Sequence, residues 1–151
     1  MAKKAKAQLY MAATDGSAAS DKALGFAIDR AKEAGARLLV VMAVQAGPIG
    51  APSSSAGTNL DLMEEVRREA QGVAERGAER AKGAGVDASA LVIYHEPPED
   101  VAAALVKFAE GRRVATIFVG SHGRTGIMRV LLGSTAEKVV KLSHCPVSVV
   151  R

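Results

Sequence analysis

Glycine and hydroxyl residues are concentrated near the C-terminus, in the segment VGSHGRTGIMRVLLGSTAEKVV over residues 119–140. Three glycines lie within seven positions, and a fourth is followed directly by a serine and a threonine. A phosphate chain is held well by several converging backbone N–H groups, which need dihedral angles and a close approach that a β-carbon would block. The free N–H groups and dipole of a helix N-terminus also favour an anion. We therefore predict an anion cradle in two halves, formed by Gly120 and Gly123 in a loop and by Gly133, Ser134 and Thr135 at a helix start.

Simpler interpretations of these residues stay open. Glycine-rich turns often serve only as connections, and Ser134 with Glu137 matches the capping box S-x-x-E, in which the serine would be a plain N-cap. The common nucleotide motifs do not decide the matter. The chain contains no G-x-x-x-x-G-K-[ST], and no G-x-G-x-x-G follows its first predicted strand, so a P-loop and a dinucleotide-binding site are excluded.

The elements that would position the cradle alternate between apolar runs and amphipathic segments. Strands are predicted over residues 8–14, 38–44, 91–95, 115–120 and 146–151. Helices are predicted from Ser17 or Ser20 to about residue 34, from Asn59 or Asp61 to Gly83, from Pro97 to Glu110, and over 134–143. Residues 45–58, rich in Gly, Pro, Ser and Ala, form a flexible segment. Apolar strands alternating with helices indicate a small doubly wound α/β fold with a parallel sheet and helices on both faces.

The ends of the first and fourth strands should meet at one crevice. In an open parallel sheet, ligands bind beyond the carboxyl ends of the strands, where the winding reverses. The first strand ends at Ala13, Thr14 and Asp15, the second at Val44, and the fourth enters the glycine loop. We predict that Asp15 faces the glycine loop, and the alternative is that Asp15 only caps the first helix.

Composition restricts the class of protein. Residues 8–151 are enough for one domain, and residues 1–7, MAKKAKA, are expected to be a flexible basic leader that carries three lysines of the net charge of +4. An aromatic content of 3% disfavours a nucleic acid partner that binds by base stacking. The leader lacks the apolar run of a signal peptide, and no apolar stretch could cross a bilayer. We therefore expect a cytoplasmic protein without a membrane partner.

The spacing Gly120-x2-Gly123-x9-Gly133-Ser134 resembles the nucleotide-binding signature of the universal stress protein family. The stretches SHGRTG, LLGSTAEKVV, CPVSVVR and, near the N-terminus, ATDGSAASDKALGFA are also similar to family sequence, so the resemblance covers residues 8–151. It implies a five-stranded parallel sheet in the order 3-2-1-4-5, a homodimer built through the C-terminal strand at residues 146–151, and membership of the ATP-binding branch.

Carried over by position, the resemblance implies a site for an adenine nucleotide. Asp15 would contact the ribose or a metal–phosphate group beside Thr14, and main-chain groups of Val44 would hold the adenine edge. Ala13 would stand in the adenine pocket, where some ATP-binding members have a proline. The residues implied on the phosphate and ribose side are Gly120, His122, Gly123, Arg124, Gly133, Ser134 and Thr135. A Mg²⁺ or Mn²⁺ ion would bridge the phosphates, with Asp15 as its candidate protein ligand.

Catalysis is a separate question from binding. Hydrolysis needs a positioned water, a base and stabilisation of the transition-state charge. Asp15 and His122 are available, but no spacing in the sequence marks either as a base, so no catalytic residue is assigned. We expect a regulatory ATP-binding module with slow hydrolysis at most. The alternatives are a dimeric interaction protein with a vestigial or empty pocket and a true ATP-hydrolysing enzyme.

Overall fold

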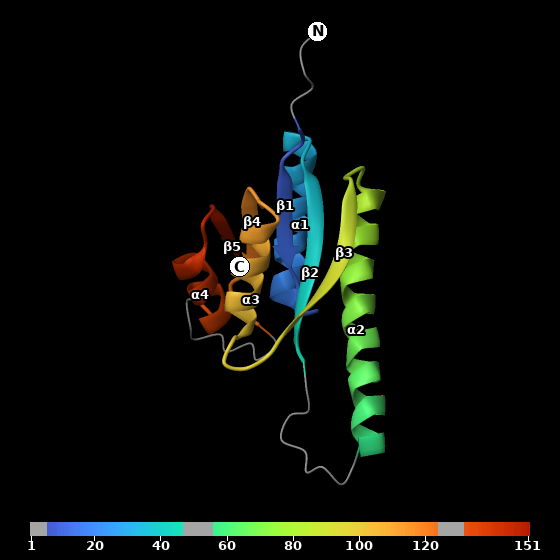
Figure 1. Ribbon diagram of the computed structural model, residues 1–151. Helices are drawn as coiled ribbons and strands as arrows, with labels where there is room; N and C mark the ends of the chain where they lie inside the picture. Colours follow the sequence, from blue (N-terminus) through green and yellow to red (C-terminus); the bar gives the residue numbers. More distant parts are fainter. Residues whose placement is uncertain (1–5, 47–55, 124–131) are drawn as a thin grey trace.

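The computed structural model describes residues 6–46, 56–123 and 132–151. Five strands form one parallel sheet in the order β3-β2-β1-β4-β5 (Figure 1). The strands are β1 Leu9–Ala13, β2 Arg37–Gln45, β3 Ala88–His95, β4 Thr116–Gly120 and β5 Val147–Val150. The helices are α1 Ala18–Ala34, α2 Ala56–Gly83, α3 Val101–Gly111 and α4 Ser134–Leu142. The doubly wound fold and the order 3-2-1-4-5 are both confirmed.

Each face of the sheet has its own apolar core. Consecutive residues of a strand point to opposite faces, so Val40 packs in the core beneath α1 and α2, whereas Val41 packs in the core beneath α3 and α4. In β4, Phe118 packs in the core beneath α1 and α2, and Ile117 packs in the core beneath α3 and α4. Burial on both faces explains why the strands read as uninterrupted apolar runs without polar alternation.

Helix α1 begins and ends as the sequence predicts. Ser17 is its N-cap, and the Ser17 side chain accepts a hydrogen bond from the Ser20 N–H. Gly35 ends the helix with φ of 61°, a left-handed conformation that glycine adopts without a steric penalty.

The starts of α2, β3 and α3 differ from the predictions. Helix α2 begins at Ala56, before Asn59, because one Gly and one Thr in a helix cost only about 1 kcal/mol or less each and do not fix a boundary. Residues 47–55 of the predicted flexible segment and residues 1–5 of the predicted leader lie outside the described residues. Strand β3 begins at Ala88, three residues earlier than predicted, because it pairs with β2 along its whole length.

The two prolines were expected to open α3, but they precede it. Asp100 is the N-cap of α3 and accepts a hydrogen bond from the Ala103 N–H at 2.9 Å. The helix therefore begins at Val101, because the Asp100 side chain accepts from one of the first backbone N–H groups, which have no acceptor within the helix.

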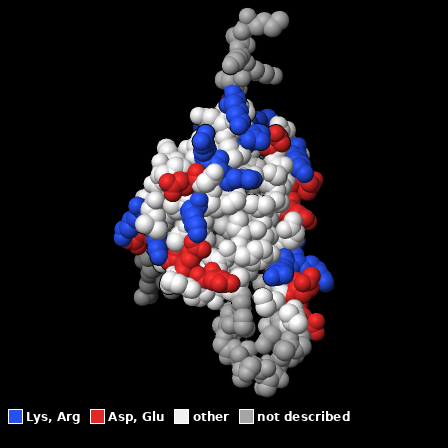
Figure 2. Space-filling model, viewed as in Figure 1, with Lys and Arg blue, Asp and Glu red and all other residues white. Residues whose placement is uncertain are grey.

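On the face of the molecule drawn in Figure 2, Lys and Arg side chains lie near Asp and Glu side chains, and a broad area without charged side chains lies among them. Within the described ranges, none of the helices combines the length and the apolar character needed to span a bilayer.

Candidate functional site

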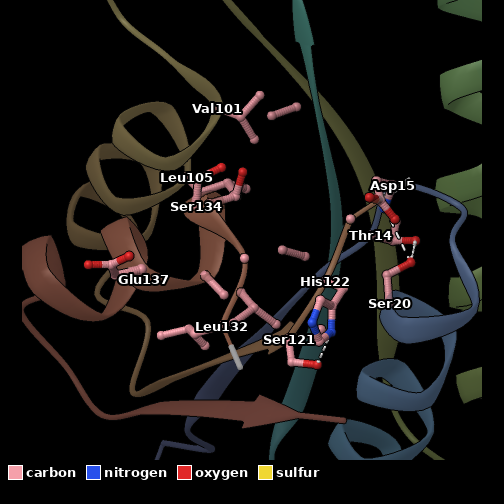
Figure 3. Close-up of a pocket in the computed structure, with 18 residues that line it drawn as sticks. Thr14, Asp15, Ser20, Val101, Leu105, Ser121, His122, Leu132, Ser134 and Glu137 are labelled. Carbon is pink, nitrogen blue, oxygen red and sulfur yellow. Dashed lines mark hydrogen bonds between the residues drawn. The ribbon is translucent and has the colours of Figure 1, made fainter. Parts of the chain in front are cut away.

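A cavity of about 620 Å³ lies at the carboxyl ends of β1 and β4 and reaches the first turns of α3 and α4. Figure 3 shows Thr14 and Asp15 on one wall and Ser134 on the opposite wall. Nearly all the predicted site residues line the cavity, namely Ala13, Thr14, Asp15, Gly120, His122, Gly123, Gly133, Ser134 and Thr135. Val44 is not among the lining residues, and its neighbour Ala43 is. Arg124 lies outside the described residues.

The turn after β1 is closed by Asp15. The Asp15 Oδ1 accepts a hydrogen bond from the Ser17 N–H at 2.9 Å, and Gly16 between them has φ of 79°. The alternative that Asp15 caps α1 is wrong, because Ser17 is the N-cap. Asp15 therefore shapes the turn and presents its carboxylate at the cavity wall.

The opposite wall is the N-terminus of α4. Hydrogen bonding within this helix begins with the Glu137 N–H, which donates to the Gly133 carbonyl at 2.9 Å. The amides of Ser134, Thr135 and Ala136 therefore have no acceptor within their own helix. All three residues line the cavity, so this end of α4 offers hydrogen-bond donors to a ligand.

The capping-box interpretation of this segment is wrong. Gly133 is the N-cap of α4 and has no side chain, so Ser134 is the first helical residue. The Ser134 hydroxyl consequently does not close the helix as an N-cap would.

The glycines of the motif serve close packing. None of Gly120, Gly123 and Gly133 has a positive φ, so the expectation of unusual dihedral angles is wrong at these positions. A β-carbon at Gly120 would lie 2.7 Å from the Ala19 carbonyl carbon, and one at Gly133 would lie 2.9 Å from the Ser121 carbonyl oxygen. These close contacts are with the main chain of the protein itself, and the expected close approach of these glycines to a phosphate stays a prediction.

Gly133 also ties α4 to the end of β4. Its N–H donates to the Ser121 carbonyl at 2.6 Å, so this amide is already used within the protein. The cradle that remains for an anion therefore begins one residue later than predicted, at Ser134.

Two buried hydroxyls that the sequence analysis did not assign to the site also line the cavity, those of Ser20 and Ser121. The Ser121 Oγ lies 2.8 Å from the His122 Nδ1 and holds that ring at the cavity floor (Figure 3). Position is the signal that could have identified both serines, since one follows the β1 turn and the other directly follows β4.

The charged side chains that line the described part of the cavity include two carboxylates, Asp15 and Glu137, and no Lys or Arg. Glu137 is paired with Lys141 at 2.7 Å, and this hydrogen bond lowers the pKa of the Glu137 carboxyl. The Glu137 carboxyl is therefore ionised at neutral pH.

An ion pair joins the two helices that line the far side of the cavity. The Lys138 ammonium of α4 donates to the Asp100 carboxylate at the start of α3. The hydrogen bond from Lys138, with a smaller effect of the Ala103 N–H, lowers the pKa of Asp100. This pair links the N-cap of α3 to the second turn of α4.

A resident metal site is not apparent in residues 6–46, 56–123 and 132–151, where no group of three or more His, Cys, Asp or Glu side chains could hold an ion. A single carboxylate on the β1 wall suits a metal that is carried by phosphates and water instead.

A doubly wound sheet with a ligand-sized cavity at the switch point between β1 and β4 is typical of α/β domains that bind small molecules at this edge. The chain belongs to the universal stress protein family, whose sequence model matches residues 10–151. Universal stress protein MJ0531 of Methanocaldococcus jannaschii is 34% identical over 139 residues, which cover 91% of this chain and 78% of that protein.

Solved structures share the fold. Universal stress protein UspA from Lactobacillus plantarum has a TM-score of 0.82 at 20% identity, with 98% of this chain and 100% of that chain covered. A universal stress protein solved in complex with cAMP has a TM-score of 0.70 at 25% identity, with 95% of this chain and 97% of that chain covered.

Proposed function

We propose that the chain binds ATP and acts in the cytoplasm as a nucleotide-dependent regulatory module of the stress response. The observation that carries the proposal is the cavity between β1 and α4, whose two walls have opposite hydrogen-bonding character. The cAMP complex of a related protein supports an adenine nucleotide as the ligand class.

The α4 wall suits the phosphates. The free amides of Ser134, Thr135 and Ala136 lie at a helix N-terminus, where the dipole adds favourable potential for an anion. The hydroxyls of Ser134 and Thr135 add donors beside them. We assign the triphosphate to this wall, with Gly123 beneath it and Arg124 as a further candidate contact.

The β1 wall suits the ribose and a metal ion. Asp15 presents a carboxylate and Thr14 a hydroxyl, and both accept hydrogen bonds. Apolar side chains of Ala43, Val101 and Leu105 complete the cavity and would contact the base, with the main chain at Val44 as the candidate partner of the adenine edge.

The proposed ligand would bring a divalent cation with it. Mg²⁺ or Mn²⁺ held mainly by phosphates and water needs few protein ligands, and Asp15 on the cavity wall is the residue proposed to hold it, directly or through water. We assign no catalytic residue, and we propose that any hydrolysis of ATP is slow.

Titration calorimetry with ATP and ADP, in Mg²⁺ and then in excess EDTA, tests the proposal. We expect binding in Mg²⁺ that weakens by about tenfold or more in EDTA, a loss of about 1.4 kcal/mol. In Asp15→Asn the difference between the two conditions should shrink, because the proposed metal contact is lost. An absence of binding up to millimolar ATP would end the proposal.

A second candidate is a dimeric interaction protein whose cavity is empty in the cell. The observation that favours it is the open edge of the sheet at β5, which pairs only with β4 in the described chain. A homodimer through residues 146–151 is compatible with both candidates, and only nucleotide binding separates them.

A further inference from the structure

The Ser20 side chain makes three hydrogen bonds beside the cavity. Its side chain is 4% exposed, and it lies in the first turn of α1 behind Thr14 and Asp15 (Figure 3). The Ser20 Oγ donates to the Ser17 carbonyl at 3.0 Å. It also accepts the Asp15 N–H at 3.4 Å and lies 3.3 Å from the Thr14 Oγ1.

These contacts fix the direction of the hydrogen bond between the two hydroxyls. A serine hydroxyl has one proton to donate and two lone pairs to accept with. The proton of Ser20 is directed to the Ser17 carbonyl, so the bond between Ser20 and Thr14 can form only if Thr14 donates. One lone pair of Ser20 then receives Thr14 and the other receives the Asp15 amide, which completes its capacity.

The consequence for Thr14 is that its own proton is used inside the protein. The Thr14 Oγ1 also accepts the Gly16 N–H at 3.3 Å, which leaves one lone pair for a ligand. The polar side-chain groups that β1 presents, the Thr14 hydroxyl and the Asp15 carboxylate, therefore both act as acceptors. A wall of acceptors matches a ligand that brings donors, such as the hydroxyls of a sugar.

We propose that Ser20 is a positioning residue that holds the Thr14 hydroxyl as an acceptor and the Asp15 turn in place, so that this wall selects a nucleotide by its ribose hydroxyls. The proposal rests on the proposed nucleotide binding and adds the reason for the choice of sugar. Ser20 acts through Thr14 and Asp15, and its hydroxyl has no remaining capacity for the ligand.

The test compares Mg²⁺-ATP with Mg²⁺-2′,3′-dideoxy-ATP by calorimetry. We expect the unsubstituted protein to prefer ATP by about tenfold, because the half-buried acceptors Thr14 and Asp15 lose their donors when the ribose hydroxyls are absent. In Ser20→Ala the Thr14 hydroxyl can turn its proton toward the cavity, and the preference should fall to about threefold or less.

Ser17→Ala is the matched control. It removes the N-cap of α1 and costs about 1 kcal/mol of folding stability, but it leaves the Ser20 hydroxyl and the Ser17 carbonyl in place. Its preference for ATP should equal that of the unsubstituted protein. Thr14→Val, which removes the acceptor itself, should lose the preference as Ser20→Ala does, and it serves if Ser20→Ala does not fold.

Hydrogen exchange at the Asp15 amide, measured without nucleotide, separates failure of this inference from failure of the proposed function. Exchange should be about fivefold faster in Ser20→Ala and unchanged in Ser17→Ala, because only the first variant removes the acceptor. If no protein binds nucleotide, the proposed function fails, and faster exchange still establishes the positioning role. Unchanged exchange, or an equal preference for ATP in Ser20→Ala and the unsubstituted protein, would overturn the inference.

Discussion

Gly123 lies directly against Asp15, and a β-carbon at Gly123 would stand 3.3 Å from the Asp15 Oδ2. This contact joins the loop after β4 to the turn after β1, which are the two sides of the proposed nucleotide site. Gly123→Val should therefore displace the Asp15 carboxylate and fill the cavity beside it. We expect ATP affinity to fall by about tenfold or more, measured by calorimetry, while the circular dichroism spectrum is unchanged.

The matched control for Gly123 is Gly111→Ala. Gly111 is the last residue of α3, and a β-carbon there would meet no atom within 4 Å. This variant should bind ATP as the unsubstituted protein does. Retained affinity in Gly123→Val would contradict the placement of the ligand beside Asp15.

A substitution at Gly120 should affect folding stability, because the atoms nearest to it belong to the main chain of α1. A β-carbon there would lie 2.7 Å from the Ala19 carbonyl carbon and 2.8 Å from the Ser20 nitrogen, so β4 and α1 would have to separate. Gly120→Ala should lower the free energy of unfolding by about 1–3 kcal/mol, measured by urea denaturation, with Gly111→Ala as the stable control. A urea midpoint equal to that of the unsubstituted protein would show that α1 and β4 accommodate the added β-carbon without loss of stability.

The same reasoning separates two roles within the glycine motif. A β-carbon at Gly133 would clash with the Ser121 carbonyl, and one at Gly120 would clash with the Ala19 main chain. A substitution at either position should therefore destabilise the fold in addition to any effect on a ligand contact. A variant that replaces Gly123 and Gly133 together could not distinguish lost binding from lost structure. Gly123 is the position at which the motif can be tested for binding alone.

The fold could be predicted from the sequence because its signals are local and repeated. Runs such as LLVVMAV mark strands buried on both faces, and Ser17 and Gly35 mark the ends of α1 by their own chemistry. The strand order came from the family resemblance, since apolar runs alone do not state which strands are neighbours.

The site was predicted by position but not in its contacts. Asp15 and Gly123 were expected at one crevice, and the structure brings them together. The sequence could not show that the Gly133 amide binds the Ser121 carbonyl, or that Ser20 bonds back to the β1 turn. Both contacts join elements whose spacing is set by tertiary packing, and no local pattern records that spacing.

The ion pair between Asp100 and Lys138 should make stability depend on pH in acid. The hydrogen bond from Lys138 lowers the pKa of Asp100 from its ordinary value of 3.8 in the folded protein. The folded state therefore binds fewer protons than the unfolded state in this range. The stabilisation is complete above the ordinary pKa and is lost as pH falls through it toward the lowered value.

Asp100→Asn isolates this effect, because asparagine is also a good N-cap and keeps the start of α3. The variant should be less stable at pH 7 by about 1 kcal/mol or less, as is usual for an exposed pair, and the difference should become smaller as pH falls below 3.8. Urea denaturation at pH 7, 5 and 3 measures it. A difference that stays constant across this range would mean that the charge of Asp100 contributes nothing.

The open edge of β5 allows the proposed homodimer to be tested without disturbing the sheet. The Ile117 N–H donates to the Pro146 carbonyl and the Ser121 N–H to the Val150 carbonyl. Main-chain groups alternate along a parallel strand, so those of Val147 and Val149 face away from β4. Val149→Pro therefore removes one outward donor and leaves the pairing with β4 intact.

We expect Val149→Pro to shift the mass measured by light scattering from dimer to monomer, with an unchanged circular dichroism spectrum. Val149→Ala keeps the N–H group and should remain a dimer, which separates the main-chain donor from the loss of the side chain. Ser148→Pro should instead destabilise the fold, because that residue faces β4. A dimer that persists in Val149→Pro would place the interface elsewhere, and a monomeric unsubstituted protein would remove the basis for a strand-mediated dimer.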